Sequence, residues 1–165
     1  MQEMPNGQDR RLVFQLLHHW REARGERLFP KLCEVYERPL GEILVNTFEL
    51  TISEPGEEPL FARIGEALQA ELDISLVAQP ISKVPRTSLL AHAVRPHKRV
   101  LKRGLPICIG GDFTNASGRL VLFRTIVMPV SEDGVRIAAL LGGANERICE
   151  PGERAAVAAA DSQPT

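Results

Sequence analysis

The segment Pro106-Ile-Cys-Ile-Gly-Gly-Asp-Phe-Thr-Asn-Ala-Ser-Gly-Arg119 and the β-rich run behind it decide the predicted fold. They predict a strand that ends in a Gly-Gly turn, a polar Asn-Ala-Ser-Gly loop and a long strand over Leu120–Val130. The turn Ser131-Glu-Asp-Gly134 leads into a third strand, Val135–Leu141, which Gly142-Gly143 closes. Because turn-forming dipeptides separate apolar runs, we expect a three-stranded antiparallel meander.

An earlier block of sequence predicts a hairpin. Asn46–Ser53 alternates apolar and polar residues, as a half-buried strand does. Glu54–Pro59 is a turn, and Leu60–Ile64 is the second strand of the hairpin. Gly65–Leu72 predicts a short helix before an irregular stretch with two prolines.

The first of two longer helices is expected over residues 11–24, where apolar residues recur at helical spacing and Gly25 suits the C-terminal cap. From its apolar face we assign Leu16, Leu17 and Trp20 to a partner or dimer surface. The helix needs such a surface because one of its faces is apolar. That surface is either the domain's own sheet or the same helix of a second chain.

The second longer helix is expected over Arg86–Arg103, with Thr87 or Ser88 as its N-terminal cap. Pro96 lies inside this range and lacks a backbone donor. A kink or break near residues 92–95 is therefore expected.

The chain has 165 residues, an ordinary apolar content and a net charge of −1, which fits one domain with no global attraction to polyanions. We expect a flexible N-terminus over residues 1–10, a single domain over 11–149 and a disordered tail over 150–165. No apolar run is long enough to span a bilayer, and the N-terminus lacks the pattern of a secretory signal, so a cytoplasmic protein is expected.

The predicted order is a helix, two strands, short helical pieces, a longer helix and three strands. Several short motifs, in order and at matching spacing, resemble those of a bacterial single-domain PAS-like family common in alphaproteobacteria. They are Trp20, Arg24-Gly25, Pro30, Phe61-Ala-Arg63-Ile-Gly65, Gly111-Asp-Phe113, Arg124, Met128-Pro129-Val130, Asp133-Gly134 and Leu140-Leu141-Gly142. One departure is Asp73-Ile74-Ser75, where that family usually has a glycine. The resemblance implies an α+β fold: a PAS-like five-stranded antiparallel sheet, helices inserted between strands 2 and 3, and an N-terminal amphipathic helix.

Gly110-Gly111-Asp112-Phe113 also resembles the signature of a diguanylate cyclase. That signature needs a second acid beside the first, and this chain lacks it. No acidic residue lies between Ala91 and Gly111, where an upstream ligand of a two-metal site would be sought. We therefore expect the glycines to form a bulge or turn and Phe113 to pack in the core.

Two charge runs stand out. The basic run contains His92, Arg95, His97, Lys98, Arg99, Lys102 and Arg103, and residues 49–73 are acidic. The basic run is either the solvated face of a helix or a docking face for an acidic partner, a phosphate-bearing ligand or nucleic acid. No interleaved aromatic residues support a base-stacking platform.

Histidine and cysteine offer no assigned site. His92 and His97 raise the hypothesis of haem ligation, but neither belongs to a haem signature, and surface or structural histidines are favoured. The three cysteines lie far apart, which favours free thiols, and Cys108 is expected to be buried in its strand.

We predict a stand-alone sensory or regulatory module that binds a small ligand, a protein partner or both and signals through protein contacts. Phe61, Phe113 and Leu122 are the candidate pocket residues. Neither a cofactor, a metal nor a catalytic residue is assigned. The expected partners are a signalling protein, a second copy of the chain and a small molecule; a membrane is not expected, and nucleic acid is not favoured. The alternatives are a ligand-free adaptor and, less favoured, a small enzyme on a curved sheet.

Overall fold

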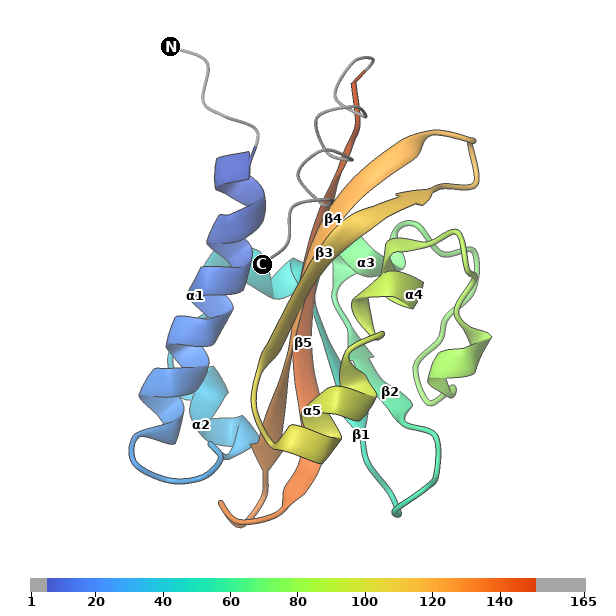
Figure 1. Cartoon of the computed structure of the whole chain (residues 1–165). Helices are drawn as coiled ribbons and strands as arrows, with labels where there is room; N and C mark the ends of the chain where they lie inside the picture. Colours follow the sequence, from blue (N-terminus) through green and yellow to red (C-terminus); the bar gives the residue numbers. More distant parts are fainter. Residues whose placement is uncertain (1–5, 151–165) are drawn as a thin grey trace.

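A computed structural model describes residues 6–150 of the chain (Figure 1). Its helices and 3-10 turns are α1 (Asn6–Arg24), α2 (Leu32–Glu37), η1 (Gly41–Asn46), α3 (Glu66–Gln69), η2 (Ile81–Lys83), α4 (Leu89–Ala93) and α5 (His97–Arg103). Its strands are β1 (Thr47–Thr51), β2 (Leu60–Ile64), β3 (Ile107–Thr114), β4 (Leu120–Ser131) and β5 (Ile137–Ile148). In the part of the chain described here, no helix is long and apolar enough to cross a bilayer.

The strands form one five-stranded antiparallel sheet in the order β2-β1-β5-β4-β3 (Figure 1). The hairpin β1–β2 and the meander β3–β4–β5 join where β1 pairs with β5. Helices α3, α4 and α5 lie between β2 and β3 in the chain. The predicted PAS-like α+β architecture is thereby confirmed.

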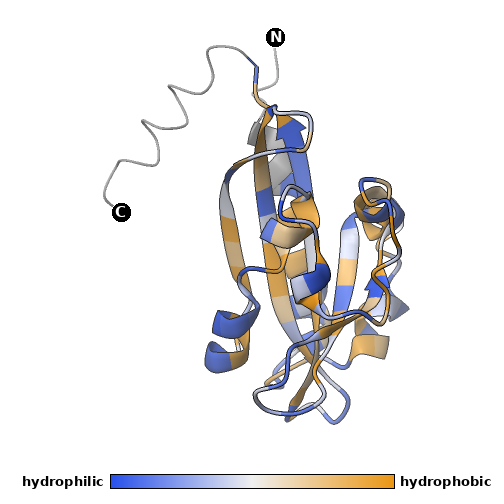
Figure 2. Ribbon diagram, turned by 90° about the vertical axis from the view of Figure 1, so that its right-hand side faces the viewer, coloured by the Kyte–Doolittle hydropathy of each residue, from blue (hydrophilic) through white to orange (hydrophobic). Residues whose placement is uncertain are grey.

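The sheet separates two helical layers. Helices α1 and α2 cover one face, and α3 to α5 cover the other (Figure 1). Seen from the side in Figure 2, apolar residues run along the strands between the layers. Each face has its own cluster of buried apolar side chains, so the sheet is buried from both sides over its central strands.

Strand β5 does not end at Gly142-Gly143, so the predicted strand end is wrong. Both glycines lie inside the strand and pair with β1 on one side and β4 on the other. A Cβ on Gly142 would overlap the Phe48 ring, and one on Gly143 would overlap the Leu16 side chain. These glycines therefore make room for packing on both faces instead of forming a turn.

The predicted Gly-Gly turn at residues 110–111 is also wrong. Both glycines lie inside β3, paired with Arg124 and Phe123 of β4, and the hairpin turn falls at residues 115–118. A Cβ on Gly111 would lie 3.2 Å from the Phe123 ring, so the missing side chain again serves packing. Phe113 is buried, as expected.

Cys108 is exposed, which corrects the prediction that it is buried. It alternates along β3 with Ile107 and Ile109, which pack against the core on the α4–α5 side. The Cys108 side chain lies on the opposite face of the sheet. Helix α1 covers that face over β4 and β5, and the edge strand β3 is left exposed there.

The predicted break at Pro96 is confirmed. Helix α4 ends at Ala93, and α5 begins at His97. Of the two residues considered as the cap, Ser88 serves, and its hydroxyl accepts a hydrogen bond from the Ala91 amide. Pro96 itself is the N-cap of α5.

The described residues begin within the N-terminal segment for which flexibility is expected. Helix α1 begins at Asn6 and therefore includes part of the segment expected to be flexible. The expectations for residues 1–5 and 151–165 lie outside the described residues.

Candidate functional site

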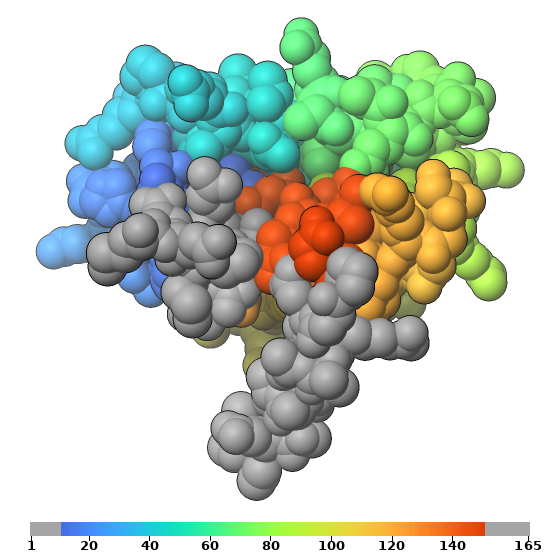
Figure 3. All heavy atoms as spheres, turned by 90° about the horizontal axis from the view of Figure 1, so that it is seen from above, coloured from blue at the N-terminus to red at the C-terminus, as the bar shows by residue number. Residues whose placement is uncertain are grey.

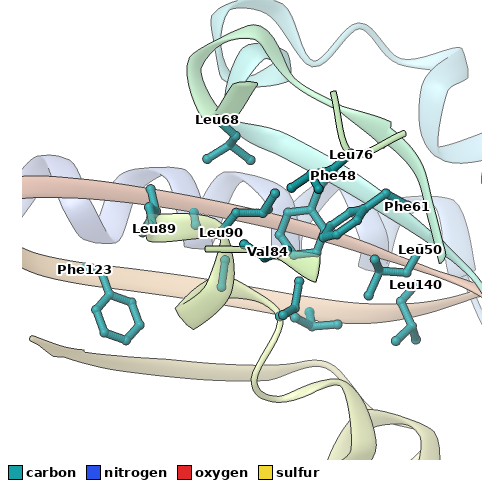
Figure 4. Close-up of a cluster of buried hydrophobic side chains, with 14 of the residues drawn as sticks. Phe48, Leu50, Phe61, Leu68, Leu76, Val84, Leu89, Leu90, Phe123 and Leu140 are labelled. Atoms are coloured by element: carbon teal, nitrogen blue, oxygen red, sulfur yellow. The ribbon is translucent and has the colours of Figure 1, made fainter. Parts of the chain in front are cut away.

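The space between the sheet and helices α3 to α5 is where the predicted pocket would lie. Its side chains come from both layers and pack closely, as Phe48, Phe61, Leu76 and Leu90 do in Figure 4. All four are at most 1% exposed, so this part of the interior is occupied by protein atoms.

The predicted pocket residues are not all brought together. Phe61 and Phe113 belong to the buried cluster on the α3–α5 side of the sheet. Leu122 is buried but does not belong to this cluster, because it alternates with Val121 and Phe123, which do. Leu122 therefore lies on the α1 side, and only Phe61 and Phe113 remain candidates for a shared pocket.

An aromatic cluster occupies the end of this layer near the β3–β4 hairpin. The His92 ring of α4 stacks on the Phe113 ring of β3, with 4.3 Å between centroids and an interplanar angle of 17°. The Phe123 ring of β4 lies 5.4 Å from His92 and 5.9 Å from Phe113. Gly111 allows this arrangement, since a larger residue would press on the Phe123 ring.

The His92 side chain is the unusual member of the cluster. Both of its ring nitrogens are buried, and neither forms a hydrogen bond of good geometry with a described residue; a polar contact with the Arg86 backbone falls short of that geometry. Burial lowers the pKa of His92, the Arg86 backbone partly offsets this, and the charge of Arg95 lowers it further. The neutral imidazole is therefore favoured, with one nitrogen able to donate and the other able to accept.

A groove of about 560 Å³ lies between the α3–α4 connection and the tip of the β3–β4 hairpin, and its lining does not include the three rings of the cluster. Figure 3 looks down on this end of the molecule, where the green α3–α4 segment, the orange hairpin and the red end of β5 meet. Ser88 lines the groove and begins the helix that carries His92. Burial raises the pKa of Glu71 on the groove wall, and a hydrogen bond with the Leu89 backbone offsets part of this.

A polar network lies on the opposite face of the sheet, at a place where the sequence predicts no site. The Glu49 carboxylate accepts hydrogen bonds from Arg63 Nε at 2.5 Å and from the Tyr36 hydroxyl at 2.6 Å. Arg63 also donates to the Tyr36 and Thr47 oxygens, at 2.7 Å each. Strand alternation places Glu49 away from the main core, but nothing in the sequence shows that α2 covers that side. These polar groups satisfy one another, which favours a structural role.

The predicted interaction helix packs on its own sheet. Leu16 and Trp20 are at most 1% exposed against β4 and β5, while Leu17 is half-buried. The Trp20 indole N–H donates to the Pro129 carbonyl at 2.7 Å. Of the two partner surfaces considered for this helix, the described structure contains the first.

The two histidines considered for haem ligation lie in different settings. His97 Nδ1 is 2.8 Å from the Val94 carbonyl, and His97 lines a different groove, beside the β1–β2 hairpin. Within residues 6–150, no group of three or more His, Cys, Asp and Glu side chains is arranged to hold a metal ion.

Comparisons with known proteins concern the fold. No protein-family model matches the chain, and no curated protein matches it in sequence. The light-state structure of the blue-light photoreceptor Aureochrome1 LOV is 10% identical, with a TM-score of 0.48 over 73% of this chain and 93% of that one.

Two further solved structures have the same kind of likeness. The LOV protein of Rhodobacter sphaeroides is 17% identical, with a TM-score of 0.45 over 69% of this chain and 66% of that one. The LOV domain of a blue-light activated histidine kinase from Erythrobacter litoralis is 11% identical, with a TM-score of 0.45 over 62% and 95%. Function must therefore be argued from this chain's own side chains.

Proposed function

We propose that this chain is a PAS-like sensory or regulatory module, which binds a small ligand beside His92 and signals through protein contacts. The observation that carries the proposal is the His92 ring, stacked on Phe113 with both nitrogens buried and without a hydrogen bond of good geometry to a described residue. A buried polar group without a partner costs free energy, which a ligand would recover by bonding to it. The groove lined by Ser88, at the start of the helix that carries His92, would give such a ligand a place to bind.

A route from this site to the opposite layer supports the signalling part of the proposal. Helix α4 carries His92 and ends at Ala93, whose carbonyl lies 3.0 Å from the Thr125 hydroxyl. The same hydroxyl lies 3.1 Å from the Gly143 carbonyl, and Gly143 faces Leu16 of α1 across the sheet. A displacement of α4 would therefore bias the packing of α1, whose exposed face is available to a partner.

The test is native mass spectrometry, with an absorption spectrum, of the chain purified from its own host. We expect the wild-type chain to carry a small molecule and His92→Phe to lose it while its circular dichroism is unchanged. Phenylalanine retains the stacking on Phe113 but has no ring nitrogen. The matched control is His18→Phe, which alters an exposed histidine of α1 and should retain the ligand.

Two results would contradict the proposal. One is a wild-type chain without any bound molecule under native conditions, and the other is a His92→Phe variant that retains its ligand. The first result would favour the ligand-free adaptor, which the closely packed interior around Phe61 supports. Neither function assigns a catalytic step to this chain.

A further inference from the structure

The outer face of α5 is a strongly basic surface. We call its exposed cations, together with Arg95 just before the helix, the basic face: Arg95, Lys98, Arg99, Lys102 and Arg103. Among the described residues, none of these side chains takes part in an ion pair. Like charges at i and i+4, such as Lys98 and Lys102, weaken a helix slightly. The helix dipole favours Lys102 and Arg103 in the last turn, but the folding of α5 gives no reason for the cations near its start.

A groove of about 610 Å³ runs beside the basic face, between α5, η2 and the tip of the β1–β2 hairpin. Leu101 and Ile81 give it apolar walls, and Lys98 of the basic face lies at its edge. Glu58, on the hairpin side, is already engaged, because its carboxylate accepts hydrogen bonds from the backbone amide and the hydroxyl of Ser82. Lys98 is thus left available to a carboxylate from outside.

We infer that this groove and the basic face together bind an acidic segment of a partner protein, in which apolar side chains are flanked by Asp or Glu. An apolar side chain would pack between Leu101 and Ile81, and the flanking carboxylates would pair with Lys98 and Lys102. The charge complementarity sets the kind of partner, and the apolar walls set the kind of segment.

A short acidic segment fits this surface better than a longer polyanion does. Glu54 and Glu57 of the hairpin are exposed, and Glu57 lines the groove, so the carboxylates of a bound segment must lie on the α5 side. A phosphate backbone or an anionic bilayer, which would extend from α5 over the hairpin, would be repelled there. The chain as a whole has a net charge of −1. The residues that line the groove include no aromatic side chain on which a base could stack.

The inference rests on the proposed function in one respect, namely that the partner reads the state of the module. Helix α5 follows directly after α4 across Pro96, so a ligand beside His92 would act on both helices. The basic face does not itself require His92, so a result that contradicts one of the two proposals leaves the other standing.

The experiment measures fluorescence anisotropy of a labelled peptide, Ser-Asp-Glu-Leu-Leu-Asp-Glu-Ser, with the full chain at about 0.1 M salt. A second peptide has Asn and Gln in place of the acids. We expect the acidic peptide to bind and the amide peptide not to bind. Lys98→Glu/Lys102→Glu should weaken binding by about tenfold or more, since it reverses the charges that would contact the peptide. The control Arg21→Glu/Arg136→Glu makes the same change in net charge at exposed sites elsewhere and should bind normally.

Several results would overturn the inference. These are no binding of the acidic peptide, equal binding of both peptides, or equal losses in the two double variants. Tighter binding of a single-stranded oligonucleotide or of phosphatidylserine vesicles, lost in Lys98→Glu/Lys102→Glu, would assign the surface to another class of partner. His92→Phe should bind the peptide normally, which separates this inference from the proposal of a ligand beside His92.

Discussion

Gly142 shows how much a single residue contributes to the packing of this sheet. It lies inside β5, directly against the ring of Phe48 on the neighbouring strand β1. Gly142→Ala would push a methyl group into that ring. Forcing extra atoms into a packed core costs about 1–3 kcal/mol, which we expect as a loss of unfolding free energy in urea titrations.

The contact with Phe48 can be tested by a double-mutant cycle. If the ring is the obstacle, Phe48→Leu should make Gly142→Ala less costly, because the shorter side chain leaves room for the methyl group. The measurement is the coupling energy between the two substitutions. Additive losses would show that the alanine is harmful for another reason and would contradict the packing role of Gly142.

The network of Tyr36, Glu49 and Arg63 connects three elements, α2, β1 and β2. Burial and the nearby Glu49 carboxylate raise the pKa of Tyr36 well above its ordinary value, so the phenol stays protonated and donates. Arg63→Met would leave the Glu49 carboxylate, 11% exposed, without its charge partner. We expect a loss of about 1–3 kcal/mol in unfolding free energy.

A surface ion pair of the same chain supplies the control for the buried network. Arg38 and Glu22 are 3.1 Å apart, and their side chains are 64% and 44% exposed. Arg38→Met should therefore change unfolding free energy by less than about 1 kcal/mol. Similar losses in the two variants would show that burial adds nothing to the Glu49–Arg63 pair.

The elements themselves could be predicted from sequence, whereas their ends and faces could not. Apolar periodicity and Pro96 suffice to predict the hairpin, the meander and the broken helix, because these signals are local. In a sequence, a glycine pair that forms a turn cannot be told from one that makes room for a neighbouring side chain. At Gly142-Gly143 that neighbour comes from β1, which is far away in the sequence.

The candidate site was predictable only in part for the same reason. The sequence predicts Phe113 as a core residue, but its stacking partner His92 comes from another element. For His92 the sequence suggests a place in the basic run, a haem ligand or, in preference, a surface or structural histidine, and none of these indicates the stacking. The sequence also suggests Leu122 as a pocket residue, whereas alternation with Phe123 places it on the other face. Which face a strand residue occupies depends on the register of the whole sheet.

At the scale of the whole molecule, the two layers have different relations to the sheet. On one face of the sheet, the long helix α1 lies with the short helix α2. The opposite layer consists of short helices, and a groove lies at each end of it. This arrangement leaves the outer side of α1 free for contacts, including Phe14, which is 63% exposed. We expect any homodimer to use this outer side, with Leu16 and Trp20 remaining on their own sheet.

A prediction about Trp20 tests whether α1 packs on its own chain. Trp20→Ala removes a fully buried side chain and its hydrogen bond to Pro129, which should cost about 3–5 kcal/mol of unfolding free energy. If the contact lies within one chain, the melting temperature of a monomer should stay constant when the protein is diluted about a hundredfold. If α1 instead packs on a second copy, unfolding also requires dissociation, and the melting temperature must fall on dilution. Since a dimer of outer α1 faces would also cause a fall, the dilution is repeated with Phe14→Glu, which places a charge on that face. A fall that persists in Phe14→Glu would contradict packing on its own sheet. Leu17→Ala, at a half-buried position of the same helix, is the matched control and should cost clearly less than Trp20→Ala.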